Sequence, residues 1–352
     1  MGLEFLGLGT AVPARSITQK TSASWSQEVL AKMGSRRRLI GEIFGRSGIE
    51  KRHSVLLQGS PATQDFFQPA DCERDAGPTT SERMQRYERE ALPIALKASR
   101  RALREARDVT HIVTASCSGF RAPGVDIGLI HGLGLPATTQ RTHVGFMGCH
   151  GAFNALRVAH GYAAQDPAAR VLVCAVELCS LHYQYGLDAG TLVANGLFAD
   201  GAAAVLAQAG DGDWNLQASG SVLLPETADM MSWEIGDHGF EMGLSGLVPD
   251  AIRSMLRPWL EPWLEQQGVP IDRVATWAVH PGGPRILTAV EKSLSLPRNA
   301  LVESRAVLRD FGNMSSPTIL FVIERLRRAQ APLPCVALGF GPGLTAEVML
   351  FT

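Results

Sequence analysis

Short apolar segments typical of buried strands alternate with segments of helical periodicity along the whole chain of 352 residues. Strands buried on both faces form nearly continuous apolar runs, whereas a helix that covers a sheet carries one apolar stripe. The alternation therefore predicts an α/β protein whose helices cover the faces of its sheets. The expected strands are residues 3–12, 110–116, 169–178, 202–208, 215–224, 274–280 and 334–341, and the expected helices are residues 81–106, 150–165, 248–266, 283–295 and 317–329.

Two stretches interrupt this alternation. Residues 54–80 show no clear period and are rich in Pro, Gly and Asp, so we expect an irregular excursion on the surface. The segment AGDGDW at 209–214 separates two strand-rich parts of the chain. We interpret it as the boundary of a weak duplication, with halves at residues 1–210 and 211–352.

Composition narrows the class of protein. The chain is 45% hydrophobic and 19% charged, with a formal net charge of −1, so it can bury a large core and has no general attraction to nucleic acid or an anionic membrane. No window holds the roughly 18 apolar residues of a spanning helix, and the first residues do not resemble a secretory signal. We expect a soluble cytoplasmic protein whose six cysteines, none spaced as CxxC, are reduced and bind no metal.

One cysteine has an unusual setting. Cys149 follows an extended segment and stands between Gly148 and Gly151, where a helical pattern rich in alanine begins. The start of a helix favours a thiolate, and the glycines permit a tight turn and the close approach of a ligand. A buried structural cysteine is the alternative, and the local sequence leaves both readings open.

A nucleophilic thiol requires a base and a hydrogen-bond donor. His280 ends the expected strand VATWAVH and precedes PGGP, which would place its side chain at a cleft. Asn313 stands in FGNMSSP before a helix, where its amide could serve the site or merely cap the helix. For the other histidines, a surface or core position is the simpler interpretation.

Five motifs, in this order along most of the chain, resemble the type III polyketide synthases, the chalcone-synthase-like branch of the thiolase superfamily. They are GCHGAFNALRVA (148–159), NGLFADGAAAV (195–205), WAVHPGGPRIL (277–287), FGNMSSPTILF (311–321) and GFGPGLTAEV (339–348). The resemblance implies a thiolase fold with five layers, αβαβα, built from two related halves, and a homodimer.

The resemblance also implies the chemistry. Cys149 would carry an acyl group taken from a coenzyme A thioester, and His280 and Asn313 would activate malonyl-CoA for decarboxylation. Two neutral N–H donors suit the oxyanion of an enolate, which a carboxylate at position 313 would oppose. An acyl-CoA starter and malonyl-CoA are then the substrates, and no cofactor is required.

Further positions match the family's substrate tunnel. Phe198 corresponds to the phenylalanine that gates the tunnel, and Phe240 is a candidate second gate, although either could be ordinary core packing. Arg46 and Gly283 are the candidates for contact with coenzyme A. The arginines at 36–38 could add positive charge at the entrance or form a solvated helix face.

Departures from the plant pattern concern the product. Cys117 replaces a threonine whose hydroxyl helps hold a water used in aldol cyclisation, so lactonisation to a pyrone is at least as favoured as a resorcinol ring. Ala122 replaces a methionine that crosses the dimer in plant enzymes, and the role of His150 beside the nucleophile is open. The positions expected to shape the pocket are Cys117, Glu177, Cys179, His182 and Ser315.

The resulting hypothesis is an iterative acyltransferase that makes an alkylpyrone or alkylresorcinol. The alternatives are a synthase of tetrahydroxynaphthalene that uses malonyl units alone, or a ketoacyl-acyl carrier protein synthase of the initiating type, although HPGG at 280–283 stands where that type more often has HQAN. A non-catalytic partner subunit would be expected to lack part of the Cys-His-Asn set. A cysteine hydrolase would leave HPGGP and GFGPGLT unexplained.

Overall fold

The computed structural model describes residues 2–60, 62–104, 106 and 108–352. The strands of its large sheet are β1 (Gly2–Ala11), β4 (His111–Ser116), β5 (Gln140–Gly145), β6 (Arg170–Leu178), β7 (Asp200–Gly210), β8 (Asn215–Leu223), β11 (Thr276–Val279), β12 (Cys335–Gly341) and β13 (Thr345–Phe351). Within the described part of the chain they run in the order β11-β12-β13-β8-β1-β7-β6-β4-β5. Every predicted strand overlaps one of these, while β5 and β13 were not among the expected strands.

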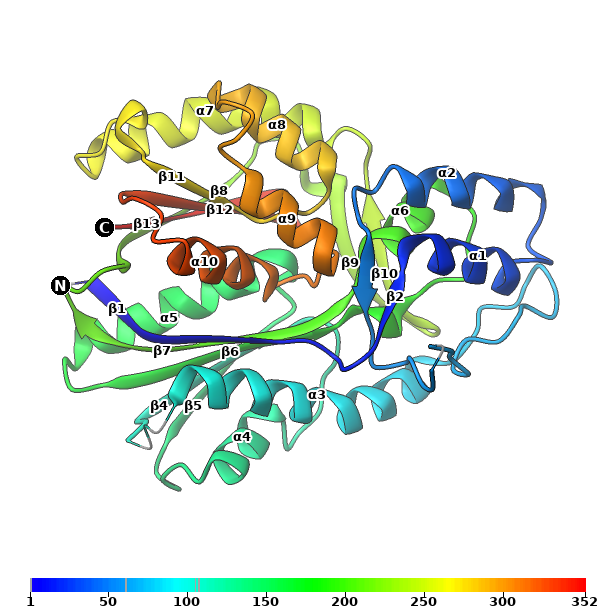
Figure 1. Ribbon diagram of the computed structural model, residues 1–352, viewed down its shortest axis with the longest axis horizontal. Helices are drawn as coiled ribbons and strands as arrows, with labels where there is room; N and C mark the ends of the chain where they lie inside the picture. Colours follow the sequence, from blue (N-terminus) through cyan, green and yellow to red (C-terminus); the bar gives the residue numbers. More distant parts are fainter. Residues whose placement is uncertain (1, 61, 105, 107) are drawn as a thin grey trace.

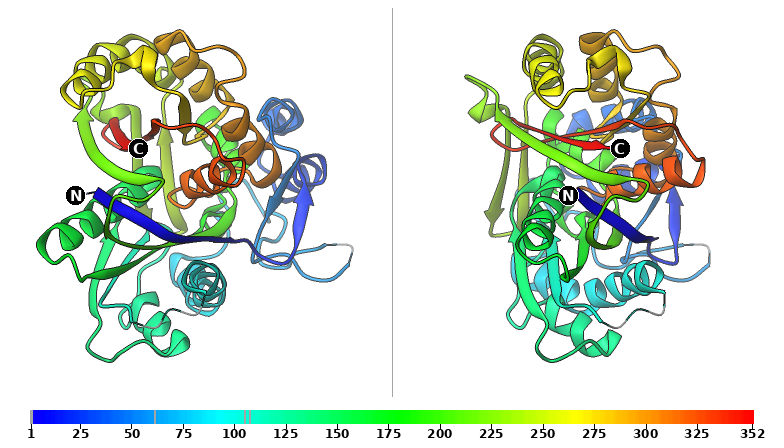
Figure 2. Two further views of the ribbon diagram at one scale, coloured as in Figure 1. Left: turned by 60° about the vertical axis from the view of Figure 1, so that its left-hand side comes forward. Right: turned by 90° about the vertical axis from the view of Figure 1, so that its left-hand side faces the viewer.

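The sheet consists of two parts joined at a narrow seam. In one part β4 runs parallel to β5 and β6, and in the other β11 runs parallel to β12, with antiparallel strands between them. The seam is the short pairing of β1 with β8, where Leu3 lies opposite Leu216 and Glu4 opposite Asn215. The ends of the chain meet here, since Asn215 and Thr352 exchange both backbone hydrogen bonds, and both termini lie close together in each view (Figures 1 and 2).

Helices cover both parts and fill the space between them (Figure 1). Three large hydrophobic clusters correspond to this order: one between the central helices and both parts of the sheet, and one under each outer pair of helices. The layers are therefore α, β, α, β, α, as expected. The outer helices are α3 (Thr80–Leu103) and α4 (Val125–Leu133) on one side and α7 (Val248–Gln266) and α8 (Pro284–Leu294) on the other, and the central ones are α5 (Gly151–Gln165) and α10 (Thr318–Arg328).

Local sequence explains the helix boundaries. Helix α3 begins with a capping box, in which Thr79 and Glu82 each bond the other's backbone N–H. It ends at Leu103, before the predicted end at 106, and Glu105 of that prediction lies outside the described residues. Small residues allow α5 to approach the strands closely, since Ala152 and Ala155 are fully buried against them.

A further group of short elements flanks the layers on one side, at the right of Figure 1. It carries part of the wall of the cavities described below. Its members, with α9 at its edge, are β2 (Ser16–Thr18), β3 (Lys51–His53), β9 (Met231–Gly236), β10 (Gly239–Leu244), α1 (Gln19–Val29), α2 (Leu39–Gly45), α6 (Ala189–Leu197) and α9 (Val302–Phe311).

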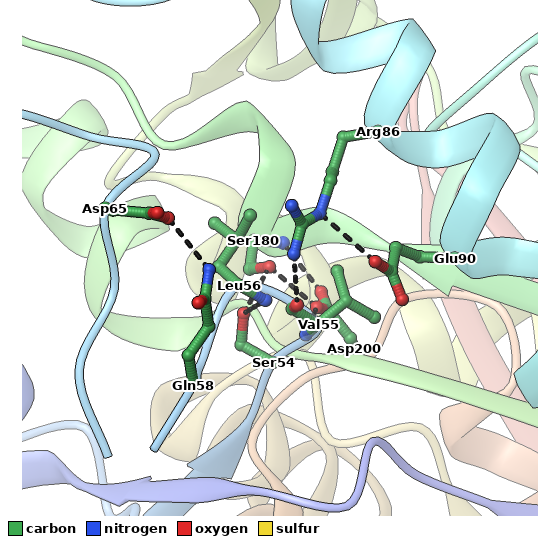
Figure 3. A network of polar contacts seen from close by, with 9 residues as sticks. All are labelled: Ser54, Val55, Leu56, Gln58, Asp65, Arg86, Glu90, Ser180 and Asp200. Carbon is green, nitrogen blue, oxygen red and sulfur yellow. Dashed lines mark hydrogen bonds and ion pairs between the residues drawn. The ribbon is translucent and has the colours of Figure 1, made fainter.

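Residues 54–60 and 62–79 form no helix or strand, as predicted, while Pro61 of that stretch lies outside the described residues. The segment is nevertheless not a simple surface excursion, because Phe67 is buried against Trp25 and Tyr183. Its start is held by the buried carboxylate of Asp200, which accepts hydrogen bonds from Val55 N (2.8 Å) and other groups in a polar network (Figure 3). The prediction missed the burial of Phe67 because the segment is rich in polar turn residues and its few apolar side chains show no period.

Among the described residues, no helix combines the length and apolar character needed to cross a bilayer.

Candidate active site

Cys149 lies in a 3-10 turn, Gly148–His150, between β5 and α5. Gly148 adopts φ 69°, and a Cβ there would lie 2.6 Å from Pro342 Cδ, so only glycine fits this turn. Phe146 also has a positive φ of 59°, which is uncommon for a bulky residue and costs energy. The turn places the thiol, 7% exposed, at the inner end of a cavity.

His280 follows β11 directly. Its backbone N–H bonds Leu338 O (2.8 Å), which continues the pairing with β12 and fixes where the side chain projects. The ring is 1% exposed, yet neither Nδ1 nor Nε2 has a hydrogen-bond partner among the described residues. Buried polar atoms without partners are rare because each costs about 1–3 kcal/mol. Their presence here indicates a group kept free for a substrate.

Asn313 stands between α9 and α10 and does not cap α10, whose first turn has no side-chain cap. Its Oδ1 accepts the backbone N–H of Ser315 at 2.8 Å. The amide is thereby oriented with Nδ2 toward Cys149 Sγ, 4.0 Å away, and toward Gly282 O, 3.4 Å away. Asn313 is therefore placed as a donor beside the thiol.

The cavity at these residues has a volume of about 470 Å³ and includes side chains of Cys149, His280 and Asn313 in its wall. It is mostly apolar, with few polar groups converging on the thiol, as in small-molecule sites generally. We call it the main cavity. Arg46, Phe198 and Gly283 also line it, so the structure brings these three candidates together with the Cys-His-Asn set.

Sequence comparison decides the family. Residues 3–211 match the N-terminal domain of chalcone and stilbene synthases, and residues 215–352 match the C-terminal domain. The chain belongs to the type III polyketide synthases. Such enzymes are acyltransferases that perform decarboxylative Claisen condensation with coenzyme A thioesters. The assignment agrees with HPGG in place of the HQAN of the ketoacyl synthase alternative.

Similar proteins include both bacterial and eukaryotic members. An alpha-pyrone synthesis polyketide synthase-like protein, Pks18, of Mycobacterium tuberculosis is 34% identical over 98% of this chain and 90% of its own length. A 1,3,6,8-tetrahydroxynaphthalene synthase of Streptomyces peucetius subsp. caesius is 32% identical over 99% and 93%. The crystal structure of PKS-I from the brown alga Ectocarpus siliculosus superposes with a TM-score of 0.93 at 27% identity, covering 99% of this chain and 98% of that one. The thiolase-type fold is thus shown.

Burial acts on the protonation of both Cys149 and His280, and at Cys149 it opposes the thiolate that the sequence favoured. Burial raises the pKa of the Cys149 thiol to about 11, and hydrogen bonds from Ser315 and Asn313 only partly oppose this effect. Burial also lowers the pKa of His280 to about 3, so the imidazole is neutral. Removal of both groups from water therefore favours the thiol form of Cys149 and the neutral form of His280.

Phe198 follows α6 directly and is held in register with the amide-bearing residue Asn313. Leu197 O accepts the N–H of Asn313, and Ala199 N–H donates to Asn313 O, both at 2.9 Å. The Phe198 carbonyl also accepts a hydrogen bond from the buried guanidinium of Arg52 (2.6 Å). The candidate gate and the amide donor therefore form one rigid unit.

Glu177 lies at the end of β6 in a small cavity of about 20 Å³ that also contains Cys117, Cys149, Cys179 and Ser315. The carboxylate is fully buried, and burial raises its pKa. Both carboxylate oxygens accept hydrogen bonds from the protein. The donors to Glu177 are Cys117 N (2.9 Å), Ser118 N (3.0 Å), Ser118 Oγ (2.6 Å), Ser116 Oγ (3.5 Å) and Ser316 Oγ (2.6 Å).

Ser316 was not predicted as a site residue, although it adjoins Ser315 in the motif GNMSS. Its hydroxyl rather than that of Ser315 holds Glu177 Oε1. The Cys117 thiol is also occupied, because it accepts the N–H of Gly148 at 2.9 Å. Only contact distances, which the sequence does not contain, distinguish the two serines.

Phe240 does not line the main cavity. It is 2% exposed and stacks on His182, with ring centroids 4.1 Å apart and planes at 15°. Both residues line a third, mainly apolar cavity of about 90 Å³, which also contains Cys179 and Phe198. We call it the apolar cavity. The structure thus separates Phe240 from the entrance that a second gate would control, whereas Phe198 and Met242 line all three cavities.

His150 points away from these cavities. Its Nδ1 donates to Asn154 Oδ1 (2.8 Å), whose Nδ2 donates to the buried Glu347 (3.2 Å). A Cβ on Gly341 would lie 2.1 Å from His150 Cδ2, so the ring packs directly on that backbone. His150 therefore supports the turn of Cys149 against the loop after β12.

The arginines at 36–38 form an exposed 3-10 turn and do not line the main cavity. Their exposure favours the interpretation of a solvated face.

Proposed function

We propose that this synthase loads an acyl group from a coenzyme A starter onto Cys149, extends it with malonyl-CoA and releases an alkylpyrone. The observation that carries the chemistry is the pair of unpartnered ring nitrogens of His280 beside the Asn313 amide at the thiol. A related pyrone-synthesis protein supports the product class.

Loading begins with two neutral groups. As the thioester approaches, the Cys149 proton passes to His280, and the thiolate attacks the thioester carbonyl. The C–S bond to coenzyme A breaks, and the departing thiolate takes the proton from His280. Because the imidazole is neutral at physiological pH, it serves as the base without prior titration.

Extension uses the same donors. The carboxylate carbon of malonyl-CoA leaves as CO₂, and the electron pair moves onto the thioester oxygen as an enolate. His280 N–H and Asn313 Nδ2 donate to that oxygen in a buried site, where such bonds are strong. The enolate carbon then attacks the acyl group on Cys149, and the Cys149 thiolate is released for the next transfer.

The cavities support an alkyl starter and lactone release. The apolar cavity adjoins the main cavity at Phe198 and Met242 and offers room for a hydrocarbon tail. Glu177 and Cys117 are occupied by internal hydrogen bonds, so they are poorly placed to hold a water for aldol cyclisation. An enol oxygen of the chain itself would then attack the thioester.

We further propose that the protein is a homodimer without a bound cofactor. We also propose that it is cytoplasmic, because that compartment supplies coenzyme A thioesters. Near the nucleophile, Phe120 and Met147 are 40% and 42% exposed, and Ala122 is also exposed. Apolar side chains of this size on a surface suit an interface. Light scattering should give twice the chain mass, and Phe120→Glu should lower it.

The test is mass spectrometry of the protein with malonyl-CoA and acyl-CoAs of increasing chain length. An acyl adduct at Cys149 and pyrone products, both absent in Cys149→Ala, are expected. Efficiency should rise about fourfold per buried methylene until the cavity is filled. Products from malonyl-CoA alone would favour the tetrahydroxynaphthalene reading, and resorcinols alone would contradict the pyrone.

A further inference from the structure

Arg52 of β3 is a buried cation without an ion-pair partner among the described residues. Burial lowers its pKa to about 10, so the guanidinium stays protonated at physiological pH. A buried charge is costly, and a fold keeps one only where other groups compensate for the lost water. The groups that surround Arg52 therefore indicate what it does.

The compensating groups are carbonyls at the end of α6. The last four carbonyl groups of a helix have no partner within it, and the helix dipole makes this end partly negative. Arg52 Nη1 donates to Asn195 O (2.8 Å) and to Phe198 O (2.6 Å). Its Nε donates to Gln19 Oε1 (3.0 Å), and Gln19 Nε2 donates to Gly196 O (2.7 Å). Arg52 and Gln19 thus cap this helix end together.

The remaining carbonyl of this helix end binds the segment that carries Asn313. Leu197 O accepts the backbone N–H of Asn313, and Asn313 O accepts that of Ala199, both at 2.9 Å. A Cβ on Gly312, which has φ 75°, would lie 3.0 Å from Arg52 Cγ. The backbone just before Asn313 therefore packs directly on the stem of Arg52. The cap and this contact together fix where the Asn313 amide lies.

The other two candidate catalytic residues are anchored elsewhere. Cys149 lies in the turn before α5, and the backbone of His280 is held by β12 through Leu338 O (2.8 Å). The side-chain hydrogen bonds of Arg52 and Gln19 found in the described part of the chain reach neither segment. Of the three candidates, Asn313 is therefore the one that depends on the end of α6.

We propose that Arg52 is a positioning residue for decarboxylation, because its cap on α6 sets the place of the Asn313 amide relative to the thioester oxygen. The inference rests on the proposed function, in which Asn313 donates to the enolate oxygen while Cys149 and His280 carry out loading. A donor displaced by about 1 Å can cost about 100-fold in rate. Loss of Arg52 should therefore slow decarboxylation far more than loading.

The experiment measures both half-reactions in Arg52→Gln. Release of CO₂ from malonyl-CoA should show a kcat lowered about 10- to 100-fold and a KM within about twofold of the wild type. Acyl transfer to Cys149 should slow by less than about threefold, because its groups are anchored elsewhere. Movement of Phe198 alone would instead raise the KM of both substrates, since a gate controls entry. Arg52→Lys keeps the charge with fewer donors and should fall between the wild type and Arg52→Gln.

Arg83 offers a matched control. It is fully buried, it also has no ion pair within the described ranges, and burial lowers its pKa to about 10. Its Nη1 donates to Leu181 O (2.8 Å) and Tyr183 O (2.7 Å), which lie outside α6. Arg83→Gln should lower the unfolding temperature as Arg52→Gln does, yet leave the ratio of decarboxylation to loading unchanged.

Gln19→Ala is the milder variant should Arg52→Gln fail to fold. It removes the donor to Gly196 O and one acceptor of Arg52, while the guanidinium keeps its bonds to α6. The ratio of decarboxylation to loading should fall about fivefold, because the helix end is loosened rather than uncapped.

Equal slowing of both half-reactions in the Arg52 and Gln19 variants, or the same change of ratio in Arg83→Gln, would overturn the proposal. Asn313→Ala, measured beside them, separates it from the proposed function. If Asn313→Ala left decarboxylation intact, the proposed oxyanion donor itself would be refuted. If Asn313→Ala slowed decarboxylation and the Arg52 variants did not, only the role of Arg52 would be refuted.

Discussion

His280 and His182 are two equally buried histidines with opposite environments. Each has a pKa lowered to about 3 by burial, so both are neutral. His182 Nε2 donates to Ser118 O (2.7 Å), and its Nδ1 accepts the N–H of Phe240 (2.9 Å). Neither nitrogen of His280 has a partner among the described residues. Burial and pKa thus do not distinguish the two imidazoles, whereas hydrogen bonding does.

The strongest test of this difference is to make the same substitution at His280 and at His182. His280→Gln should reduce condensation about 10³- to 10⁴-fold while leaving thermal unfolding nearly unchanged, because it removes the proposed proton carrier without breaking a side-chain hydrogen bond of the fold. His182→Gln should instead destabilise the protein by about 1–3 kcal/mol, since a buried N–H of Phe240 loses its acceptor.

Activity and calorimetric unfolding of both variants provide the measurement. Loss of activity with unchanged stability in His182→Gln would contradict a structural role for His182 and a catalytic role for His280.

The pH dependence of Cys149 alkylation tests the neutral pair. With a thiol pKa of about 11, the rate of modification by iodoacetamide should rise about tenfold per pH unit between pH 7 and 10. The sign follows from burial, which favours the protonated thiol, so reactivity appears only as pH approaches the raised pKa. A rate that is already constant above about pH 6 would instead indicate a thiolate-imidazolium pair.

Asn313→Ala separates the two half-reactions. Acyl transfer to Cys149 should persist, whereas decarboxylation of malonyl-CoA should fall about 10²- to 10³-fold because one of two oxyanion donors is lost. Acyl-adduct mass and released CO₂ measure the two steps independently. Asn313→Asp should be at least as slow, since its charge opposes the enolate. Equal loss of both steps would contradict this division.

The smallest effect is expected at Cys117. Cys117→Thr introduces a hydroxyl near Glu177 and should shift products from pyrone toward resorcinol by a few-fold, in keeping with the modest energies of pocket changes. Chromatographic product ratios measure it, with Cys174→Thr, a buried thiol outside the three cavities, as the control. An unchanged ratio would show that Glu177 and its neighbours do not direct cyclisation.

Much of the fold follows from short-range pattern. Short apolar runs located most strands of the core, because strands buried on both faces form nearly continuous apolar segments. Thr79 marks the start of a helix because its side chain accepts a backbone hydrogen bond, and Gly148 marks a turn because it adopts a positive φ. The irregular stretch that contains Phe67 was harder, because its anchors contact Trp25 and Tyr183 far away in sequence.

The sequence by itself determined the α/β class and the family and singled out Cys149, His280 and Asn313 as candidate catalytic residues, because these depend on residue types in a recognisable order. Only the tertiary structure showed how these and neighbouring residues are surrounded. It showed that the ring nitrogens of His280 have no partner among the described residues, that Glu177 bonds Ser316 rather than Ser315, and that Phe240 does not line the main cavity. The physical reason is that burial and hydrogen bonding depend on distances between segments more than a hundred residues apart, and those distances exist only after folding.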